Sequence, residues 1–209
     1  MTTKKASNRG RPRGFDLDAA IAIAMDLFHQ RGYDGVGVAE LSKTIGITAP
    51  SLYAAFGSKR ELFEQVLQRY AQQEGCWMPA IFMTEEPLET VIHTLFISAA
   101  EVYTRDPEHL GCLIIDGTRN CGDPQAQALT AGFRQASRQA IGDRIQSGAT
   151  HLKTAQVEAL ANYVITVLVG LSGSARDGMT PAALHTTAEI AAAGFAQQLQ
   201  QYSHERNSV

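Results

Sequence analysis

The sequence predicts an all-α protein of about nine helices, with a small N-terminal three-helix unit and a larger C-terminal helical bundle. Apolar residues recur every three or four positions along nearly the whole chain, which is helical spacing, and no stretch alternates as a strand does. The 209 residues are enough to bury a substantial core. An apolar fraction of 44% and a charged fraction of 19% are typical of a folded protein.

Helix-start and helix-stop residues divide the first third of the chain into four helices. The first predicted helix begins after Asp16, whose side chain suits a helix cap, and ends at Gly32. Two short helices follow, over residues 38–45 and 49–55. A fourth, over 59–75, opens with a capping box and has an apolar face.

A joint at Gly75 and Pro79 separates these helices from the second region. Helical spacing then resumes, and proline suits the first turn of a helix. The first predicted helix of this region begins near Pro87 and ends near Asp106. A shorter helix, interrupted near Gly117, is predicted within 109–122. Three longer helices are predicted over about 123–148, 154–176 and 181–202.

The segment 41–55 has the residue pattern of a helix-turn-helix. Ser42 is small enough for two steeply crossing helices to approach, and Gly46 lies in the turn, where a positive φ is needed. Thr48 can cap the second helix. A plain helical hairpin within a core is the alternative interpretation. Apolar residues flank the turn at Leu41, Ile45, Ile47 and Leu52.

Charge is distributed unevenly along the chain, although the net charge is only -3. Residues 1–70 hold ten basic and seven acidic side chains, whereas residues 71–209 hold eight and fourteen. We expect residues 1–14 to form a flexible basic arm. Its Arg9-Gly10-Arg11-Pro12-Arg13 run resembles an AT-hook, so Arg11 and Arg13 are expected to enter a narrow minor groove. A solubilising tail is the alternative.

Residues 47–62, Ile-Thr-Ala-Pro-Ser-Leu-Tyr-Ala-Ala-Phe-Gly-Ser-Lys-Arg-Glu-Leu, closely resemble the signature of the tetracycline-repressor (TetR) family. In that signature Leu-Tyr-x-x-Phe ends the recognition helix and Ser-Lys-x-x-Leu opens the next. Residues 24–33 match the end of the family's first helix, and the specific likeness covers about 15–70. Gly37 departs from the Ser or Thr that is usual there, but glycine is a fair substitute cap.

The resemblance implies a DNA-binding transcriptional regulator, a repressor that a small-molecule ligand releases from a palindromic operator. It implies a helix-turn-helix domain over 15–58, a connecting helix over 59–75, and a ligand-binding and dimerisation domain over 76–209. Leu52 and Phe56 would then anchor the recognition helix. The DNA contacts are expected to be Thr48, Ala49 and Ser51 to base edges, and Tyr53 and Lys59 to phosphates.

The second region is expected to bind the ligand and to form a homodimer, because one reading head covers only half of a palindrome. Two apolar stripes, on residues 157–171 and 188–195, are predicted to pack between protomers, with closure of the core of each protomer as the alternative. Candidate ligand-binding residues are Trp77, Phe96, Tyr103, Cys112 and Arg119.

Two other functions are alternatives. The first is regulation by cysteine oxidation or electrophiles at Cys112 and Cys121. On one continuous helix these residues would lie about 13.5 Å apart, too far for a disulfide, but a break at Gly117 would change that spacing. An all-α enzyme or ligand-binding protein with an incidental basic tail is the alternative from another class. The sequence gives no sign of an enzyme's nucleophile or phosphate loop, and the six histidines are dispersed.

We therefore expect neither a catalytic site nor a metal or other cofactor. The three cysteines are too few for a disulfide framework and fit a reducing compartment, and the chain starts without a signal peptide. The uncharged stretch 159–175 falls short of a membrane span of about 20 residues. A cytoplasmic protein without a membrane partner is the expectation.

Overall fold

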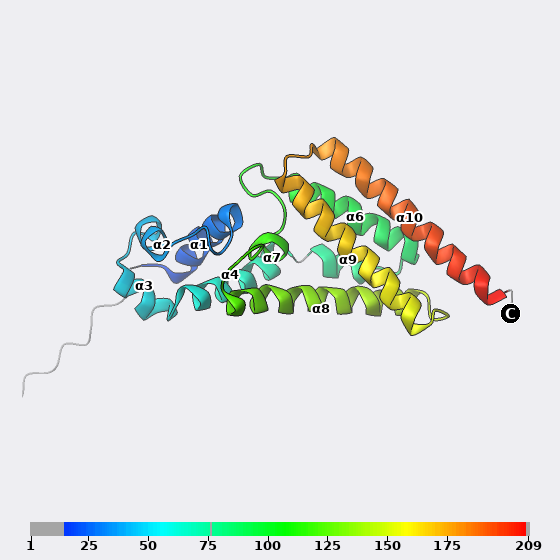
Figure 1. Ribbon diagram of the computed structural model, residues 1–209, viewed down its shortest axis with the longest axis horizontal. Coiled ribbons are helices and arrows are strands. Elements are labelled where there is room, and N and C mark those ends of the chain that lie inside the picture. The colour runs from blue at the N-terminus through cyan, green and yellow to red at the C-terminus, as the bar shows by residue number, and fades with distance from the viewer. Residues whose placement is uncertain (1–14, 76, 208–209) are drawn as a thin grey trace, which may run out of the picture.

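The computed structural model describes residues 15–75 and 77–207, so the predicted arm over 1–14, with Arg11 and Arg13, lies outside the described residues. The molecule is elongated, with a helical head at one end and a longer helical body behind it (Figure 1). No strand occurs among the residues that are described, which agrees with the predicted all-α fold. The head consists of α1 (Leu17–Arg31), α2 (Val38–Ile45), α3 (Ala49–Phe56) and α4 (Lys59–Gln73).

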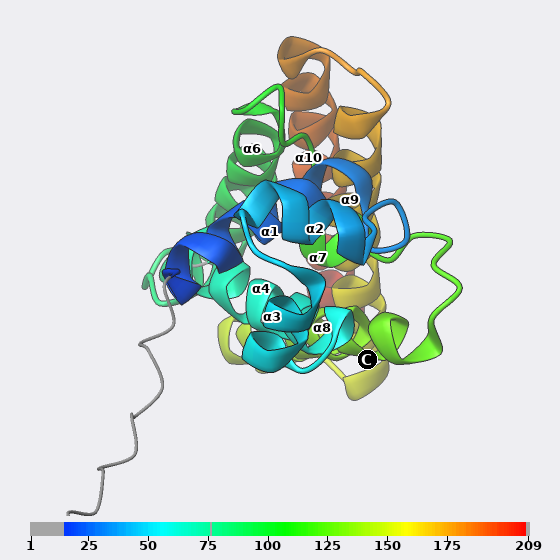
Figure 2. The ribbon, with the colours of Figure 1, turned by 90° about the vertical axis from the view of Figure 1, so that its left-hand side faces the viewer.

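The body begins with the short α5 and ends with two long helices. Its elements are α5 (Trp77–Phe82), α6 (Leu88–Thr104), α7 (Leu113–Asp116), α8 (Pro124–Gly148), α9 (Thr154–Arg176) and α10 (Pro181–Asn207). Figure 2 looks onto the head and shows α1, α2 and α3 nearest the viewer with the body behind them.

Most predicted elements are present, and the differences occur at the joints. Asp16 caps α1 by accepting the amide of Asp18 at 2.9 Å, as predicted. Around Pro79, where a joint was expected, the chain instead forms α5. Proline interrupts a helix only beyond its first turn, and in this six-residue element Pro79 is the third residue. The helix predicted within 109–122 is a single turn, α7.

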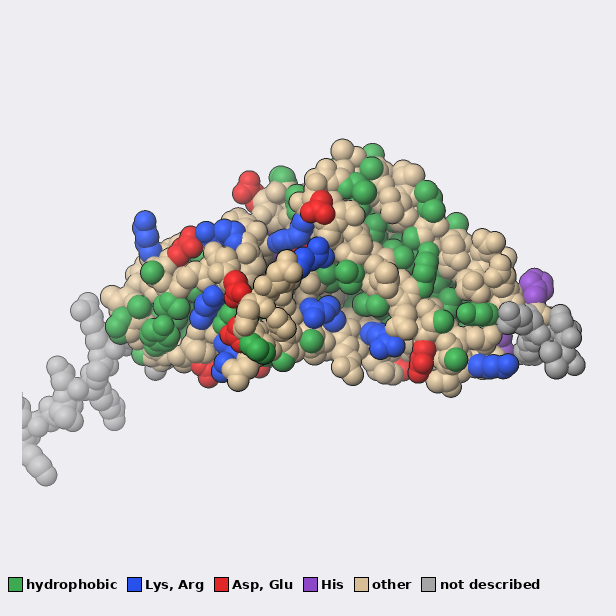
Figure 3. Space-filling view, in the orientation of Figure 1, with side chains coloured by type: hydrophobic (Ala, Val, Ile, Leu, Met, Phe, Trp, Pro, Cys, Tyr) green, Lys and Arg blue, Asp and Glu red, His purple; other side chains and the backbone are tan. Residues whose placement is uncertain are grey.

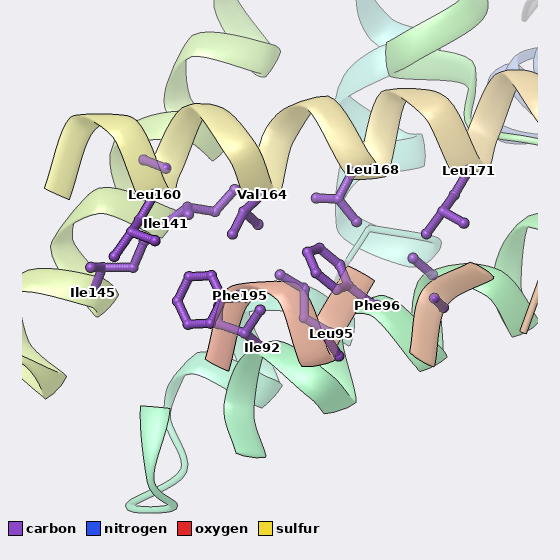
Figure 4. Packing of buried hydrophobic residues seen from close by; sticks show 14 of the residues in the cluster. Ile92, Leu95, Phe96, Ile141, Ile145, Leu160, Val164, Leu168, Leu171 and Phe195 are labelled. Carbon is purple, nitrogen blue, oxygen red and sulfur yellow. The ribbon is translucent and has the colours of Figure 1, made fainter. Parts of the chain in front are cut away.

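Two clusters of buried residues hold the chain together. The head cluster joins α1, α3 and α4, and it reaches Leu113 and Cys121 in the body. The body cluster fills the space between α6, α8, α9 and α10, where the labelled side chains of Figure 4 point toward one another. Because side chains from the body complete the head cluster, a displacement of the head disturbs contacts in both parts.

The predicted dimer stripes are wrong as an interface. The structure places these residues inside a single protomer, where they pack against α6 and α8, because the apolar face of each helix has partners in its own chain. The alternative interpretation, closure of the core of each protomer, is the correct one for the buried members of this set: Val157, Leu160, Ala161, Val164, Leu168, Leu171, Ala188, Ala192 and Phe195. The remaining member, Ala191, is partly buried against the same cluster.

Of the described helices, α9 alone is long and apolar enough to cross a membrane, judged by length and composition. Its buried face belongs to the body cluster, with Leu160, Val164 and Leu168 at its centre. The apolar composition of α9 is therefore accounted for by packing among helices.

Candidate nucleic-acid interface

The turn between α2 and α3 has the geometry that the sequence predicts. Gly46 adopts φ 80° and ψ 28°, a left-handed conformation that favours glycine, and its added Cβ would meet nothing within 4 Å. Backbone strain, rather than lack of space, thus requires glycine here. The amide of Ile47 donates to the carbonyl of Ser42 at 2.9 Å, and Ser42 is buried where the two helices approach.

The start of α3 presents small hydroxyl side chains. Thr48 caps the helix by accepting the amide of Ser51 at 3.3 Å, and the two hydroxyl oxygens lie 2.9 Å apart. Thr48 is exposed, whereas Ala49 and Ser51 are half-buried. These three side chains therefore lie together at one helix end, where the helix dipole is positive.

The opposite face of α3 fixes the helix to the head. Leu52 has no exposed surface and Phe56 is buried, and both belong to the head cluster. Tyr53, one residue after Leu52, points away from that cluster with 49% of its surface exposed. This division gives α3 a buried anchoring face and an exposed face of Thr48 and Tyr53.

Lys59, a predicted phosphate contact, is not extended into open solvent. Its ammonium lies 4.0 Å from the centre of the Tyr33 ring, a cation–π contact that sequence reasoning missed because Tyr33 follows α1 by two residues and had no assigned role. Burial lowers the pKa of Lys59, and the carboxylates of Asp34 and Asp123 oppose that shift. Lys59 thus faces the junction between head and body.

Backbone and side-chain contacts join the head to the segment between α7 and α8. The amide of Tyr33 donates to the carbonyl of Gly117 at 2.7 Å, and the amide of Gly122 donates to Asp34 at 2.6 Å. The Tyr33 hydroxyl donates to Asp123 at 3.2 Å. Burial, with that hydrogen bond, raises the pKa of Tyr33 to about 12.

A buried carboxylate supports the same junction from the body side. Asp116 accepts the Ser172 hydroxyl at 2.6 Å, and Arg119 and Arg176 lie 2.8 Å and 3.6 Å from its two oxygens. Arg176 also donates to the backbone carbonyl of His29 at the end of α1. Through Arg176, the α7–α9 contact is continuous with the head.

A cavity of about 220 Å³ lies between α4 of the head and α5, α6, α7, α8 and α9 of the body. Three of the predicted ligand-binding residues, Trp77, Tyr103 and Cys112, line it. Tyr70 and Phe133 line it too; sequence reasoning assigned Tyr70 only to the apolar face of the fourth helix and gave Phe133 no role. Burial raises the pKa values of the Tyr103 hydroxyl and the Cys112 thiol, so both groups are neutral at pH 7.

The other two candidates lie outside the lining of this cavity. Phe96 has no exposed surface and sits within the body cluster, with its ring centre 6.4 Å from that of Tyr163. Arg119 pairs with Asp116, and its guanidinium lies against Gly173. The structure thus brings three of the five candidates together and separates the remaining two.

The cysteines Cys112 and Cys121 are both free thiols. They do not lie on one helix, because α7 ends at Asp116 and Asn120 adopts a positive φ of 60°. Cys121 donates from its thiol to Asp34 at 3.3 Å, whereas Cys112 lines the cavity. Within residues 15–75 and 77–207, no group of three or more His, Cys, Asp or Glu side chains is placed to hold a metal ion.

Comparison with known proteins identifies the family. Residues 20–66 match the sequence profile of the bacterial regulatory proteins of the tetR family. The chain is 38% identical to the HTH-type transcriptional repressor BdcR of Escherichia coli over 91% of this chain and 95% of that protein. The chain belongs to the TetR family. It is a helix-turn-helix transcriptional regulator, and α2, the Gly46 turn and α3 form its helix-turn-helix.

Other TetR proteins agree with this assignment in sequence and in fold. The HTH-type transcriptional repressor ComR of Escherichia coli is 32% identical over 82% of this chain and 84% of its own length. The TetR regulator CifR, solved as a cysteine mutant with 26-bp double-strand operator DNA, superposes with a TM-score of 0.79. It is 33% identical, with coverage of 87% of this chain and 98% of CifR.

Proposed function

We propose that this TetR regulator is a cytoplasmic repressor without enzymatic activity, which binds a palindromic operator as a homodimer. Its relatives BdcR and ComR are transcriptional repressors, and CifR was solved bound to operator DNA; both observations support the proposal. The observation that carries it is the division of α3, which buries Leu52 and Phe56 and exposes Thr48 and Tyr53. In this proposal residues 15–58 bind DNA, 59–75 connect, and 76–209 bind the effector and the second protomer.

In the bound state the N-terminal end of α3 would lie in the major groove. Thr48, Ala49 and Ser51 are small, so they suit methyl contacts and single hydrogen bonds to base edges. Tyr53 would donate its hydroxyl to a phosphate. The Lys59 ammonium, which lies against the Tyr33 ring, would pair with a phosphate.

The first described residue, Phe15, lies beside α3, which supports a role for the basic arm over residues 1–14 in DNA binding. Phe15 lines a surface hollow together with Thr48 and Ser51, and its ring centre lies 6.4 Å from that of Phe56. The described part of the chain therefore begins beside the N-terminal end of α3. We propose that Arg11 and Arg13 add minor-groove contacts next to the site that α3 reads.

For the homodimer we propose the outward faces of α9 and α10, in place of the buried stripes. Ile190 is 70% exposed, and Ala193 and Gly194 beside it are small. Tyr163 of α9 donates to the carbonyl of Ala191, so the two helices present one continuous surface. In Figure 3 the slope over α9 and α10 is largely uncharged. A surface of small and apolar side chains suits close helix packing between protomers.

We propose that the effector is a small, largely apolar molecule in the cavity near Trp77. Its walls are aromatic and aliphatic, with Tyr103, Ile165 and Leu168 opposite α5. Trp77 is the chain's single tryptophan, so its fluorescence reports on this cavity. An aromatic test ligand that does not absorb at the excitation wavelength of tryptophan, such as toluene, should quench Trp77 emission saturably and weaken operator binding over the same concentrations. Quenching without an effect on DNA would exclude this cavity as the effector site.

Cysteine chemistry is the second candidate for regulation, because Cys112 lies on the same cavity wall. Its raised pKa opposes the thiolate form, which is the reactive one, and therefore favours the ligand mechanism. Mild oxidant followed by mass spectrometry and a parallel operator-binding assay separates the two. Modification of Cys112 at the dose that releases DNA supports the redox mechanism, and unmodified thiols at that dose exclude it.

A gel-shift titration across salt concentrations tests DNA binding against the enzyme alternative. A protein that neutralises phosphates loses affinity linearly in log–log form, with a slope of about -0.9 per phosphate on B-DNA. An all-α enzyme or ligand-binding protein with an incidental basic tail would give no shift beyond what the tail alone produces.

A further inference from the structure

A second cavity, of about 230 Å³, lies between the head and the body. The head lines it with Asp26 and His29 from α1 and with Tyr70 and Glu74 from α4. The body lines it with the end of α6 and with His109 in the segment that follows. This cavity shares only Tyr70 and Glu74 with the cavity near Trp77, so the two cavities have mostly different linings.

His29 presents an unused hydrogen-bond acceptor in this cavity. Its ring is 8% exposed, and its Nε2 atom is buried without a partner. Burial, together with the positive charge of Arg176, lowers the pKa of His29 to about 4, so the ring is neutral at pH 7. Because Nε2 has no partner, we assign the hydrogen bond between this ring and the Gly111 backbone to the other nitrogen, Nδ1, which then carries the proton. Nε2 then offers a lone pair.

A second acceptor and a carboxylate lie beside it. The ring centres of His29 and His109 are 5.4 Å apart, and His109 uses Nδ1 in a 2.7 Å contact with Asp106. Its Nε2 is buried without a hydrogen-bond partner, 3.6 Å from the Asp26 carboxylate. When Nδ1 of a neutral His109 ring donates to Asp106, Nε2 is an acceptor, so two ring nitrogens and the Asp26 carboxylate line one cavity.

The charges of the lining favour a cation. Asp26, Glu74 and Asp106 contribute three carboxylates to the lining and Arg105 one positive charge. Arg176, outside the lining but close enough to lower the pKa of His29, is a second positive charge that the carboxylates must outweigh. Arg105 is already paired with Glu74 at 2.6 Å. Tyr70 and the two histidines provide aromatic walls, which also attract cations.

We propose that this cavity between head and body binds a small organic cation with several N–H donors, such as an alkylammonium or guanidinium group. The cation would donate to the free Nε2 atoms of His29 and His109 and pair with Asp26. A buried acceptor without a partner is costly, and a bound cation supplies the missing donors. This proposal holds whether or not the cavity near Trp77 binds the effector.

Binding at this place would also act on DNA affinity. The acceptors come from both parts, His29 and Asp26 from the head and His109 from the body, so the cation binds best when they converge. A ligand that prefers one position of the head shifts the population toward it. Reciprocity then requires that operator DNA change the affinity for the cation by the same factor.

Isothermal titration calorimetry of the full chain with 1,4-diaminobutane tests the proposal, with 1,4-butanediol as the neutral molecule of matched shape. We expect saturable binding of the diamine and none of the diol. Asp26→Asn should weaken binding by about tenfold, the size of one charge-assisted hydrogen bond. Asp18→Asn, an exposed carboxylate on the same helix outside the cavity, should leave it unchanged.

His29→Phe provides a second variant, which keeps an aromatic ring and removes the acceptor. It should lose diamine binding while unfolding cooperatively, and the Asp26→Asn result stands if this variant misfolds. Equal binding of diamine and diol, or equal losses for Asp26→Asn and Asp18→Asn, would overturn the site and leave a cavity filled by water. Because calorimetry is run without DNA, failure here is distinct from failure of the proposed repressor function.

Discussion

Thr48 combines folding and recognition in one side chain. Its hydroxyl accepts the Ser51 amide and caps α3, while its exposed methyl group is free to meet DNA. Loss of a threonine cap costs about 1 kcal/mol. A substitution that removes the hydroxyl therefore changes stability and recognition together, and the two effects need separate variants.

We predict that Thr48→Ser keeps the cap but alters base preference, whereas Thr48→Ala also lowers the free energy of unfolding by about 1 kcal/mol. Urea unfolding measures the stability of each variant, and selection from a randomised operator library measures base preference. If Thr48→Ser selects the same sequences as the parent protein, Thr48 does not read bases.

His29 gives the chain a stability that depends on pH. Its pKa is about 4 in the folded protein and near 6.5 unfolded, so the unfolded chain binds the proton more tightly. Folding stability is unaffected above pH 6.5 and is lost as the pH falls toward 4, by roughly 3 kcal/mol. Urea unfolding of the parent protein and of His29→Phe at several pH values gives the contribution of His29 protonation to the free energy of unfolding. Parallel curves for the two proteins would refute it.

Among the elements, α7 and its flanking segments are the part that the sequence describes least well. The amphipathic spacing of the long helices and the Gly46 turn are local signals, and both are visible from the residues. The one-turn helix α7 depends on distant partners, Ser172 and Arg176 on α9, and both also approach Gly111 so closely that an added Cβ there would meet each of them at 3.0 Å. No pattern in residues 109–122 alone reveals those contacts.

The same physical reason explains which parts of the site were predictable. Thr48, Tyr53 and the anchors Leu52 and Phe56 are placed by one helix and its cap, so their arrangement follows from local sequence. The partner of Lys59, the Tyr33 ring, depends on how α1 and α4 cross. Phe96 and Trp77 are equally plausible from sequence, and only packing decides that Trp77 lines the cavity.

The buried carboxylate of Asp116 is expected to be the strongest single link between α7 and α9. We predict that Asp116→Asn lowers the free energy of unfolding by about 3 kcal/mol, because it leaves Arg176 without its charge partner in a buried place. Chemical denaturation measures the loss. Asp143→Asn, at an exposed carboxylate on α8, is the matched control and should change stability little. Equal effects of the two substitutions would show that Asp116 has no special role.

On the scale of the whole molecule, the proposal requires two heads held at a fixed spacing of roughly 34–36 Å or a multiple of it. The head and the proposed dimer surface lie on different parts of the elongated chain (Figure 1). Contacts at the junction, from Tyr33 to Gly117 and from His29 to Arg176, therefore determine how the position of a head follows the state of the body.

We predict that Ile190→Glu converts the dimer to monomer, because it places a charge at the centre of the uncharged surface of α9 and α10. Analytical ultracentrifugation measures the state, and operator affinity should fall as the two half-sites are no longer bound together. Met83→Glu, at an apolar residue after α5 that is 85% exposed, is the control and should remain dimeric. If Ile190→Glu remains dimeric, the dimer interface does not lie on this surface of α9 and α10.

The central claim is that the exposed face of α3 binds duplex DNA, and fluorescence anisotropy across salt concentrations tests it most directly. The parent protein is titrated with the DNA upstream of its own gene, alongside Tyr53→Phe and Lys59→Ala. We expect a log–log salt slope of about -0.9 per phosphate contact, weaker binding by both variants, and a flatter slope for Lys59→Ala. Absence of binding in dilute salt, or unchanged affinity in both variants, would contradict the claim.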